Sequence, residues 1–162
     1  MNTIFLALGS NVGDREANLR NAVTELERGE VQVLRRSSLY ETEPQELRDQ
    51  PWFLNAVVEV ESGLSALQLL ARIREIEQEM GRRRVISKGP RNIDIDILFY
   101  GQSVVETAEL KVPHPRLSQR RFVLEPLAEI APGFKHPVTG KTASEMLEAL
   151  EPQGVRRLNI TL

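Results

Sequence analysis

The sequence predicts an α+β domain whose strands and helices follow the order β-α-β-β-α-β. Two observations support this prediction. Several short stretches are continuously apolar or alternate between apolar and polar residues, which is typical of strands. Two longer stretches carry apolar residues every three or four positions, which is typical of helices with one buried face. Glycine, proline and polar residues separate these stretches and mark the turns.

The first three elements lie between the N-terminus and residue 42. Residues 3–8 (TIFLAL) form an apolar run that ends at Gly-Ser-Asn and predict a buried strand. Asp14 can cap the helix that follows, and Gly29 ends it. The apolar stripe of this helix consists of Leu19, Ala22, Val23 and Leu26. Residues 31–42 are rich in β-forming residues and predict one continuous strand.

A loop, a strand and a helix come next. Residues 43–52 are polar, contain two prolines and predict a loop. Residues 54–60 alternate in polarity and predict a strand. Ser65 and Gln68 have the spacing of a capping box, and Gly81 ends the helix that this box begins.

The sixth element is a strand with an acidic face. A basic loop, residues 82–91, leads into Asn-Ile-Asp-Ile-Asp-Ile at 92–97, where polar and apolar residues alternate, and Gly101 closes the strand. The resulting order is that of the ferredoxin-like split βαβ fold, a mainly antiparallel sheet with helices packed on it.

The remaining residues predict a C-terminal extension of this core. Residues 118–130 read as a helix interrupted by Pro126. Thr142 and Glu145 form a second capping box, and residues 155–162 predict an added edge strand. We therefore expect a single domain over residues 1–162.

Composition excludes several classes of function. The chain has 21 basic and 23 acidic residues, so it lacks the basic excess of a protein that wraps nucleic acid. It has no cysteine, which excludes disulfides, thiolate catalysis and zinc–thiolate sites. No apolar run is long enough to span a bilayer, and the N-terminus does not resemble a signal peptide. We expect a cytoplasmic monomer that binds neither nucleic acid nor membrane.

Asp94 and Asp96 are the strongest candidates for chemistry. A strand places alternate side chains on one face, so these carboxylates are neighbours while Ile93, Ile95 and Ile97 point into the core. Two carboxylates on a rigid element suit Mg²⁺, which completes its coordination with water and phosphate oxygens. A solvated strand face with aspartates paired to arginines is the alternative, and a bare Asp-x-Asp favours it.

Basic residues surround this strand in the sequence. Five cations precede it, namely Arg82, Arg83, Arg84, Lys88 and Arg91, which is more than two aspartates need. Four further candidates follow, namely His114, Arg116, Arg120 and Arg121. A polyphosphate would use this surplus, because guanidinium groups bind phosphate oxygens bidentately. A solvated basic loop and a structural histidine remain the alternatives.

Asn55 and Phe53 lie on the same face of the third predicted strand. An amide can pair with a planar heterocycle, and an aromatic ring can stack on it. An ordinary polar group near the start of a strand is the alternative.

Five stretches together make the chain resemble the 6-hydroxymethyl-7,8-dihydropterin pyrophosphokinase family of folate biosynthesis. They are LGSNVGDREANL, YETEP at 40–44, DQPWFLNAVVEV, GPRNIDIDILFYG and VPHPRLSQRRFVLEPL, in this order over nearly the whole chain. The resemblance implies transfer of a diphosphate from ATP to a pterin hydroxymethyl group, with release of AMP. It also implies two Mg²⁺ ions bound by Asp94 and Asp96. Asp96 is in addition a candidate for assisting removal of the hydroxyl proton.

The resemblance assigns further roles by position. Arg82 and Arg91 would be catalytic, together with the two aspartates. The ATP-binding positions would be Glu77, Arg84, Ile97, His114 and Arg120. The pterin would be bound by Thr42, Phe53, Asn55 and Phe122.

Two positions depart from the family pattern. Residues 45–48 read Gln-Glu-Leu-Arg where many relatives carry a glycine- and proline-rich run, and Lys88 replaces a tryptophan found in some relatives. A non-catalytic ferredoxin-like domain that binds a nucleotide or metabolite is the alternative function. A ferredoxin-like RNA-binding module is disfavoured, because it needs exposed aromatics on the sheet and aromatics are only 5% of the residues.

Overall fold

The computed structural model describes residues 2–44, 49–81 and 92–162. The predicted positions Arg82, Arg84, Lys88 and Arg91 and the departing residues 45–48 lie outside these ranges. The βαββαβ core, whose second strand is divided into β2 and β3, consists of β1 (Asn2–Ser10), α1 (Arg15–Arg28), β2 (Val31–Arg36), β3 (Ser38–Thr42), β4 (Phe53–Ser62), α2 (Ala66–Glu79) and β5 (Asp94–Tyr100). The remaining elements are β6 (Val105–Glu106), β7 (Lys111–Val112), the 3-10 turn η1 (Leu117–Gln119), α3 (Arg121–Ile130), α4 (Ala143–Glu148) and β8 (Val155–Thr161).

The main sheet is antiparallel and has the strand order β5-β1-β4-β3-β8, with β2 also paired to β4. Both central strands, β1 and β4, come from the ferredoxin-like core, and the C-terminal strand β8 forms one edge as predicted. The other edge is β5, which carries Asp94 and Asp96. The predicted fold class is confirmed.

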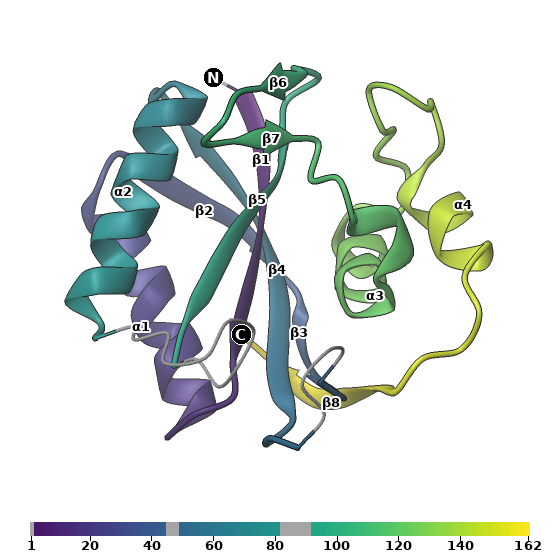
Figure 1. Ribbon diagram of the computed structural model, residues 1–162, viewed down its shortest axis with the longest axis horizontal. Coiled ribbons are helices and arrows are strands. Elements are labelled where there is room, and N and C mark those ends of the chain that lie inside the picture. The colour runs from purple at the N-terminus through teal and green to yellow at the C-terminus, as the bar shows by residue number, and fades with distance from the viewer. Residues whose placement is uncertain (1, 45–48, 82–91) are drawn as a thin grey trace.

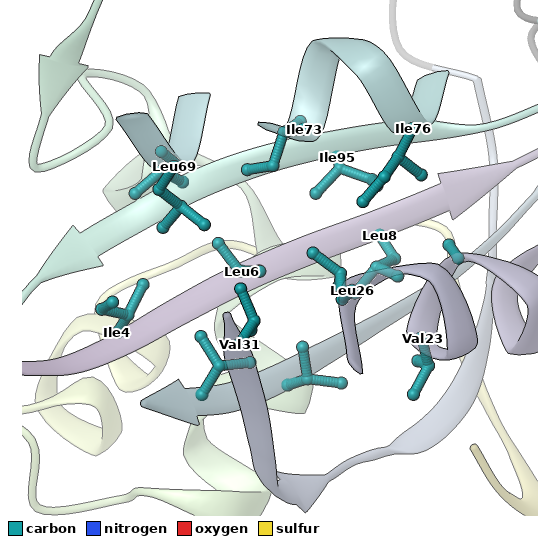
Figure 2. Packing of buried hydrophobic residues seen from close by; sticks show 14 of the residues in the cluster. Ile4, Leu6, Leu8, Val23, Leu26, Val31, Leu69, Ile73, Ile76 and Ile95 are labelled. Carbon is teal, nitrogen blue, oxygen red and sulfur yellow. The ribbon is translucent and has the colours of Figure 1, made fainter. Parts of the chain in front are cut away.

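The two faces of the sheet are covered by different helices (Figure 1). Helices α1 and α2 pack on one face, where Ile4, Leu6 and Leu8 of β1 and Ile95 of β5 meet Leu69, Ile73 and Ile76 of α2 (Figure 2). Helices α3 and α4 pack on part of the opposite face, around Phe5, Val57 and Phe99. The C-terminal extension therefore covers part of the second face of the sheet, whereas the helices of the core cover the first face.

The predicted helix boundaries hold where capping residues mark them. Asp14 accepts a hydrogen bond from the amide of Ala17, and Gly29 follows α1. Both predicted capping boxes form, at Ser65 with Gln68 and at Thr142 with Glu145. These side chains satisfy amides that the first turn of a helix leaves without an internal acceptor.

Two predictions about single elements were wrong. Residues 31–42 form two strands, because Ser37 leaves the strand path: its hydroxyl accepts from the amide of Val57, and its own amide donates to the Val57 carbonyl. Pro126 does not interrupt its helix, since α3 runs through it from Arg121 to Ile130. An interior proline removes one hydrogen bond and crowds the carbonyl four residues earlier, so the packing of α3 against the sheet holds the helix across Pro126.

Candidate active site

The edge strand β5 separates apolar from acidic side chains as its sequence predicts. Ile95 and Ile97 on β5, with Ile93 just before it, are buried in the core beneath α1 and α2. Asp94 and Asp96 are half-buried on the opposite face. The apolar side anchors the strand, and this fixes where the two carboxylates stand.

A pocket of about 380 Å³ follows this edge of the sheet. Helix α2 forms one wall, and residues 109–115 form another. Its lining comprises Leu70, Ile73, Arg74, Glu77, Asp94, Ile95, Asp96, Ile97, Glu109, Leu110, Lys111, His114 and Pro115. The pocket thus gathers the carboxylate pair with three other predicted positions, Glu77, Ile97 and His114.

Glu77 links helix α2, which forms one wall of the pocket, to strand β5. One oxygen of its carboxylate accepts a hydrogen bond from the Ile95 amide at 3.0 Å. Ile95 lies between the two aspartates, so this bond holds the backbone that sets their spacing. An edge strand has unpaired backbone groups, and Glu77 satisfies one of them.

His114 is held as a neutral imidazole. Its backbone amide donates to the Leu98 carbonyl at 3.0 Å, and its Nδ1 accepts from the Arg116 amide at 3.2 Å. Burial lowers the pKa of His114 to about 4, assisted by the charges of Arg120 and Arg116 and opposed by Asp94. Because Nδ1 is an acceptor, the single proton of the neutral ring lies on Nε2. His114 can therefore donate one hydrogen bond to an anion near neutral pH.

A second group of predicted residues lies on β3 and β4. The Nδ2 of Asn55 donates to the hydroxyl of Thr42, and both residues are buried. Phe53 lies two positions before Asn55 on the same face of β4. The hydrogen bond fixes the amide plane of Asn55, which is what recognition of a planar heterocycle requires.

Gly9 joins this group to the carboxylate pair. It is the register partner of Asn55 on one side of β1 and of Asp94 on the other. Directly opposed residues of antiparallel strands project to the same face, so Asn55 and Asp94 stand on one face, about 10 Å apart across β1. A Cβ at Gly9 would lie 2.8 Å from the Oδ1 of Asn55 and 3.7 Å from Phe53. The glycine therefore leaves space for the Asn55 amide above β1.

Arg120 and Phe122 stand at the start of α3. The Arg120 guanidinium carbon lies 5.5 Å from the centroid of the Phe122 ring, within cation–π range. Phe122 is half-buried and packs against the α3 core. The lining of the β5 pocket, as far as the described residues define it, includes neither of these side chains nor Thr42, Phe53 and Asn55. The predicted residues thus form three groups. The carboxylate group lies at β5, the amide group lies around Asn55, and the third group consists of Arg120 and Phe122 at the start of α3.

The donor set at β5 fits Mg²⁺ that is shared with a phosphate. Residues 2–44, 49–81 and 92–162 contain no cluster of three or more His, Asp or Glu side chains that could bind a metal by themselves. Asp94 and Asp96 supply two carboxylates, whose oxygens are hard ligands. Mg²⁺ in nucleotide sites is typically bound in this way, with water and phosphate oxygens as the remaining ligands.

Sequence reasoning missed several residues of these groups. Arg74, Glu109 and Lys111 add charge to the pocket. Arg74 lies one helical turn before Glu77, so the shared face of α2 was a usable signal. No signal in the sequence linked Gly9 to Asn55, since that link depends on strand register.

The fold and the site define a ferredoxin-like α+β protein with two half-buried carboxylates and a buried amide on one face of its sheet. Residues 5–132 match the family model described as 7,8-dihydro-6-hydroxymethylpterin-pyrophosphokinase (HPPK). The chain therefore belongs to the 7,8-dihydro-6-hydroxymethylpterin-pyrophosphokinase family. Pyrophosphokinases of this family use ATP as co-substrate, generally with Mg²⁺.

Individual relatives agree with this assignment. The chain is 48% identical over 130 residues to the 2-amino-4-hydroxy-6-hydroxymethyldihydropteridine pyrophosphokinase of Bacillus subtilis, covering 80% of this chain and 78% of that protein. It is 40% identical over 153 residues to the folic acid synthesis protein fol1 of Pneumocystis carinii, covering 94% of this chain. The chain spans only about a fifth (21%) of that longer relative.

The fold also matches a solved structure. Plasmodium falciparum HPPK-DHPS crystallised with pteroate superposes with a TM-score of 0.74 at 18% identity, over 91% of this chain and 42% of that one. None of the helices in the described part of this chain has the length and apolar character that a membrane crossing needs.

Proposed function

We propose that this chain transfers the diphosphate group of ATP to the hydroxymethyl group of 6-hydroxymethyl-7,8-dihydropterin and releases AMP. The register of Gly9 carries the proposal, because it places Asn55 and Asp94 on one face of the sheet. A pterin paired with Asn55 would have the metal-binding carboxylates about two strand spacings away, roughly 10 Å. This span suits a substrate alcohol directed toward a metal-bound polyphosphate.

The polyphosphate side of the site consists of charged groups around β5. Asp94 and Asp96 would hold two Mg²⁺ ions, which when bound neutralise the phosphate charge. His114, through Nε2, and Arg120 would donate to phosphate oxygens. Glu77 and Ile97 would lie beside the nucleotide. We also assign phosphate contacts to Arg82, Arg84 and Arg91, which lie outside the described residues.

The pterin side consists of an amide and aromatic rings. Asn55 would pair with the edge of the heterocycle, with its amide plane fixed by Thr42. Phe53 and Phe122 would stack on the two faces of the pterin ring. Aromatic stacking positions a planar substrate with little conformational cost, because both rings are already half-buried.

In the reaction the hydroxymethyl oxygen forms a bond to the β-phosphorus, and the bond from that phosphorus to the oxygen of the α-phosphate breaks. AMP leaves with that oxygen, and the hydroxyl proton is released. Transfers of this kind depend mainly on alignment and charge neutralisation. Asp96, the carboxylate nearer the centre of β5, is the candidate that would assist removal of the hydroxyl proton.

Incubation with ATP, Mg²⁺ and the hydroxymethyl-dihydropterin tests the proposal. We expect AMP and the pterin diphosphate in equal amounts and no product when Mg²⁺ is chelated. ADP as the main product would indicate an ordinary kinase. Binding of both substrates without turnover would favour the non-catalytic binding domain instead.

We also propose that one copy of the chain is sufficient, as a cytoplasmic monomer, because every residue assigned above belongs to a single chain. Light scattering of the purified protein tests the oligomeric state: a dimer that dissociates into inactive chains would contradict it.

A further inference from the structure

The segment between α4 and β8 contacts the start of α3, where Arg120 and Phe122 stand. The side chain of Gln153 makes two hydrogen bonds there. Its Oε1 accepts from the Arg121 amide at 3.0 Å, and its Nε2 donates to the Gln119 carbonyl at 3.1 Å. The two bonds fall on either side of Arg120, so one amide group clamps the turn from η1 into α3.

This clamp replaces a missing helix cap. The first amides of a helix have no acceptor within it, and a side chain at the N-cap position usually supplies one. The N-cap residue of α3 is Arg120, which makes no side-chain capping bond. Gln153, distant in sequence, supplies the acceptor instead. The orientation of the first turn of α3, and with it of Phe122, therefore depends on residue 153.

The next residue contacts the opposite side of the same region. The Gly154 carbonyl accepts from the Glu43 amide at 2.9 Å, directly after Thr42. A Cβ at Gly154 would lie 3.0 Å from the Cβ of Glu43, so the two backbones are closely packed. Residues 153 and 154 thus join the Phe122 side of the proposed pterin site to its Thr42 side.

We propose that Gln153 is a positioning residue for the pterin, acting through α3 and Phe122. The inference rests on the proposed function and extends it, because the family model ends at residue 132 and does not include this segment. The clamp also flanks Arg120, but Arg120 is only one of several groups assigned to the ATP phosphates, so Gln153 acts on the substrate that stacks on Phe122 more than on ATP. Its loss should weaken pterin binding selectively.

Two substitutions at this position separate capping from general stability. Gln153→Ala removes both hydrogen bonds. Gln153→Glu keeps an oxygen that accepts from the Arg121 amide, where a carboxylate is favourable at the helix N-terminus, but it has no donor for the Gln119 carbonyl. Gln102→Ala is the matched control, because Gln102 also donates to a backbone carbonyl, that of Lys135, on an exposed surface.

The experiment measures KM for each substrate, kcat, and the dissociation constant of the pterin in the presence of a non-transferable ATP analogue. For Gln153→Ala we expect the pterin KM and dissociation constant to rise about fivefold, the equivalent of one lost cap. The ATP KM and kcat should stay within about twofold, and the amide of Arg121 should exchange hydrogen faster. Gln153→Glu should recover part of the loss, with a pterin dissociation constant between those of Gln153→Ala and wild type, and Gln102→Ala should match wild type.

Three results would overturn the inference. They are unchanged pterin binding in Gln153→Ala, an equal or larger rise in the ATP KM, and a Gln153→Glu variant as impaired as the alanine variant. Each is read against a wild type that binds both substrates and releases AMP. A wild type that releases no AMP contradicts the proposed function instead, so the two failures are distinguishable.

Discussion

The carboxylate end and the amide end of the proposed site are assembled in different ways. The carboxylate end comes from a compact part of the sequence, with both aspartates on β5 and the pocket walls on α2 and residues 109–115. The amide end joins β3, β4, the start of α3 and the C-terminal segment at Gln153. The carboxylate end can therefore largely be predicted from a short stretch of sequence. The residues of the amide end come together only in the folded chain.

The two ends also depend on different physical interactions. Charges act over several ångströms, so the carboxylate end depends above all on the charges of Asp94 and Asp96. Pairing and stacking act at contact distance, so the amide end depends on the exact placement of one amide and two rings. Changes at the carboxylate end should therefore reduce kcat, and changes at the amide end should raise the pterin KM.

Asp96→Asn is the strongest test of this contrast. The substitution keeps the shape of the side chain and removes the charge that would bind Mg²⁺. We expect kcat to fall on the order of a thousandfold, because a catalytic metal contributes several kcal/mol of charge stabilisation. The pterin dissociation constant should change little. Steady-state kinetics and calorimetry measure the two quantities.

Glu61→Gln is the control for Asp96→Asn, since it also removes a carboxylate from a strand but outside the pocket. It should retain wild-type turnover. Near-normal kcat in a folded Asp96→Asn protein would refute the role of the carboxylate pair.

Gly9→Ala tests the junction between the two ends and should have an intermediate effect. The new Cβ would lie 2.8 Å from the Oδ1 of Asn55, so the amide must shift and its Nδ2 would move away from the Thr42 hydroxyl. We expect the pterin KM to rise about tenfold, equivalent to one displaced hydrogen bond, with a smaller change in the ATP KM. Initial rates with each substrate varied in turn measure both.

Gly63→Ala is the matched control for Gly9→Ala, because a Cβ at Gly63 meets no atom within 4 Å. It should behave as wild type. A larger change in the ATP KM than in the pterin KM for Gly9→Ala would place the glycine at the carboxylate end and break the proposed division.

This contrast explains how much the sequence could reveal. Alternation at 92–97 was sufficient to predict that the isoleucines are buried and the aspartates are not, because a strand enforces that period. The capping boxes were equally local. The division of the chain at Ser37 depends on the backbone of Val57, and the cap on α3 depends on Gln153, so neither could be inferred from neighbouring residues.

Glu129 of α3 stabilises the strands that carry the amide end. This carboxylate accepts from the amide and hydroxyl of Ser38, from the Tyr40 hydroxyl at 2.9 Å and from Arg157. Burial, followed by the hydrogen bond to Glu129, raises the pKa of Tyr40 well above its usual value. Because Tyr40 is the register partner of Asn55, this network fixes α3 and β8 to the strand beside the amide.

Tyr40→Phe should have the smallest effect on catalysis and a measurable effect on stability. At pH 7 we expect about 1.5 kcal/mol less free energy of unfolding, the contribution of a hydrogen bond to a charged acceptor, and a pterin KM within about twofold of wild type. The raised pKa of Tyr40 stabilises the wild type fully below the unfolded pKa of about 10, and this stabilisation is lost as the pH rises above it. The stability gap between wild type and Tyr40→Phe should therefore narrow as the pH rises above about 10, as measured by urea unfolding. A gap that stays constant or widens would show that Tyr40 ionises as readily in the folded chain as in the unfolded one. The hydrogen bond to Glu129 would then not be what supports the amide end.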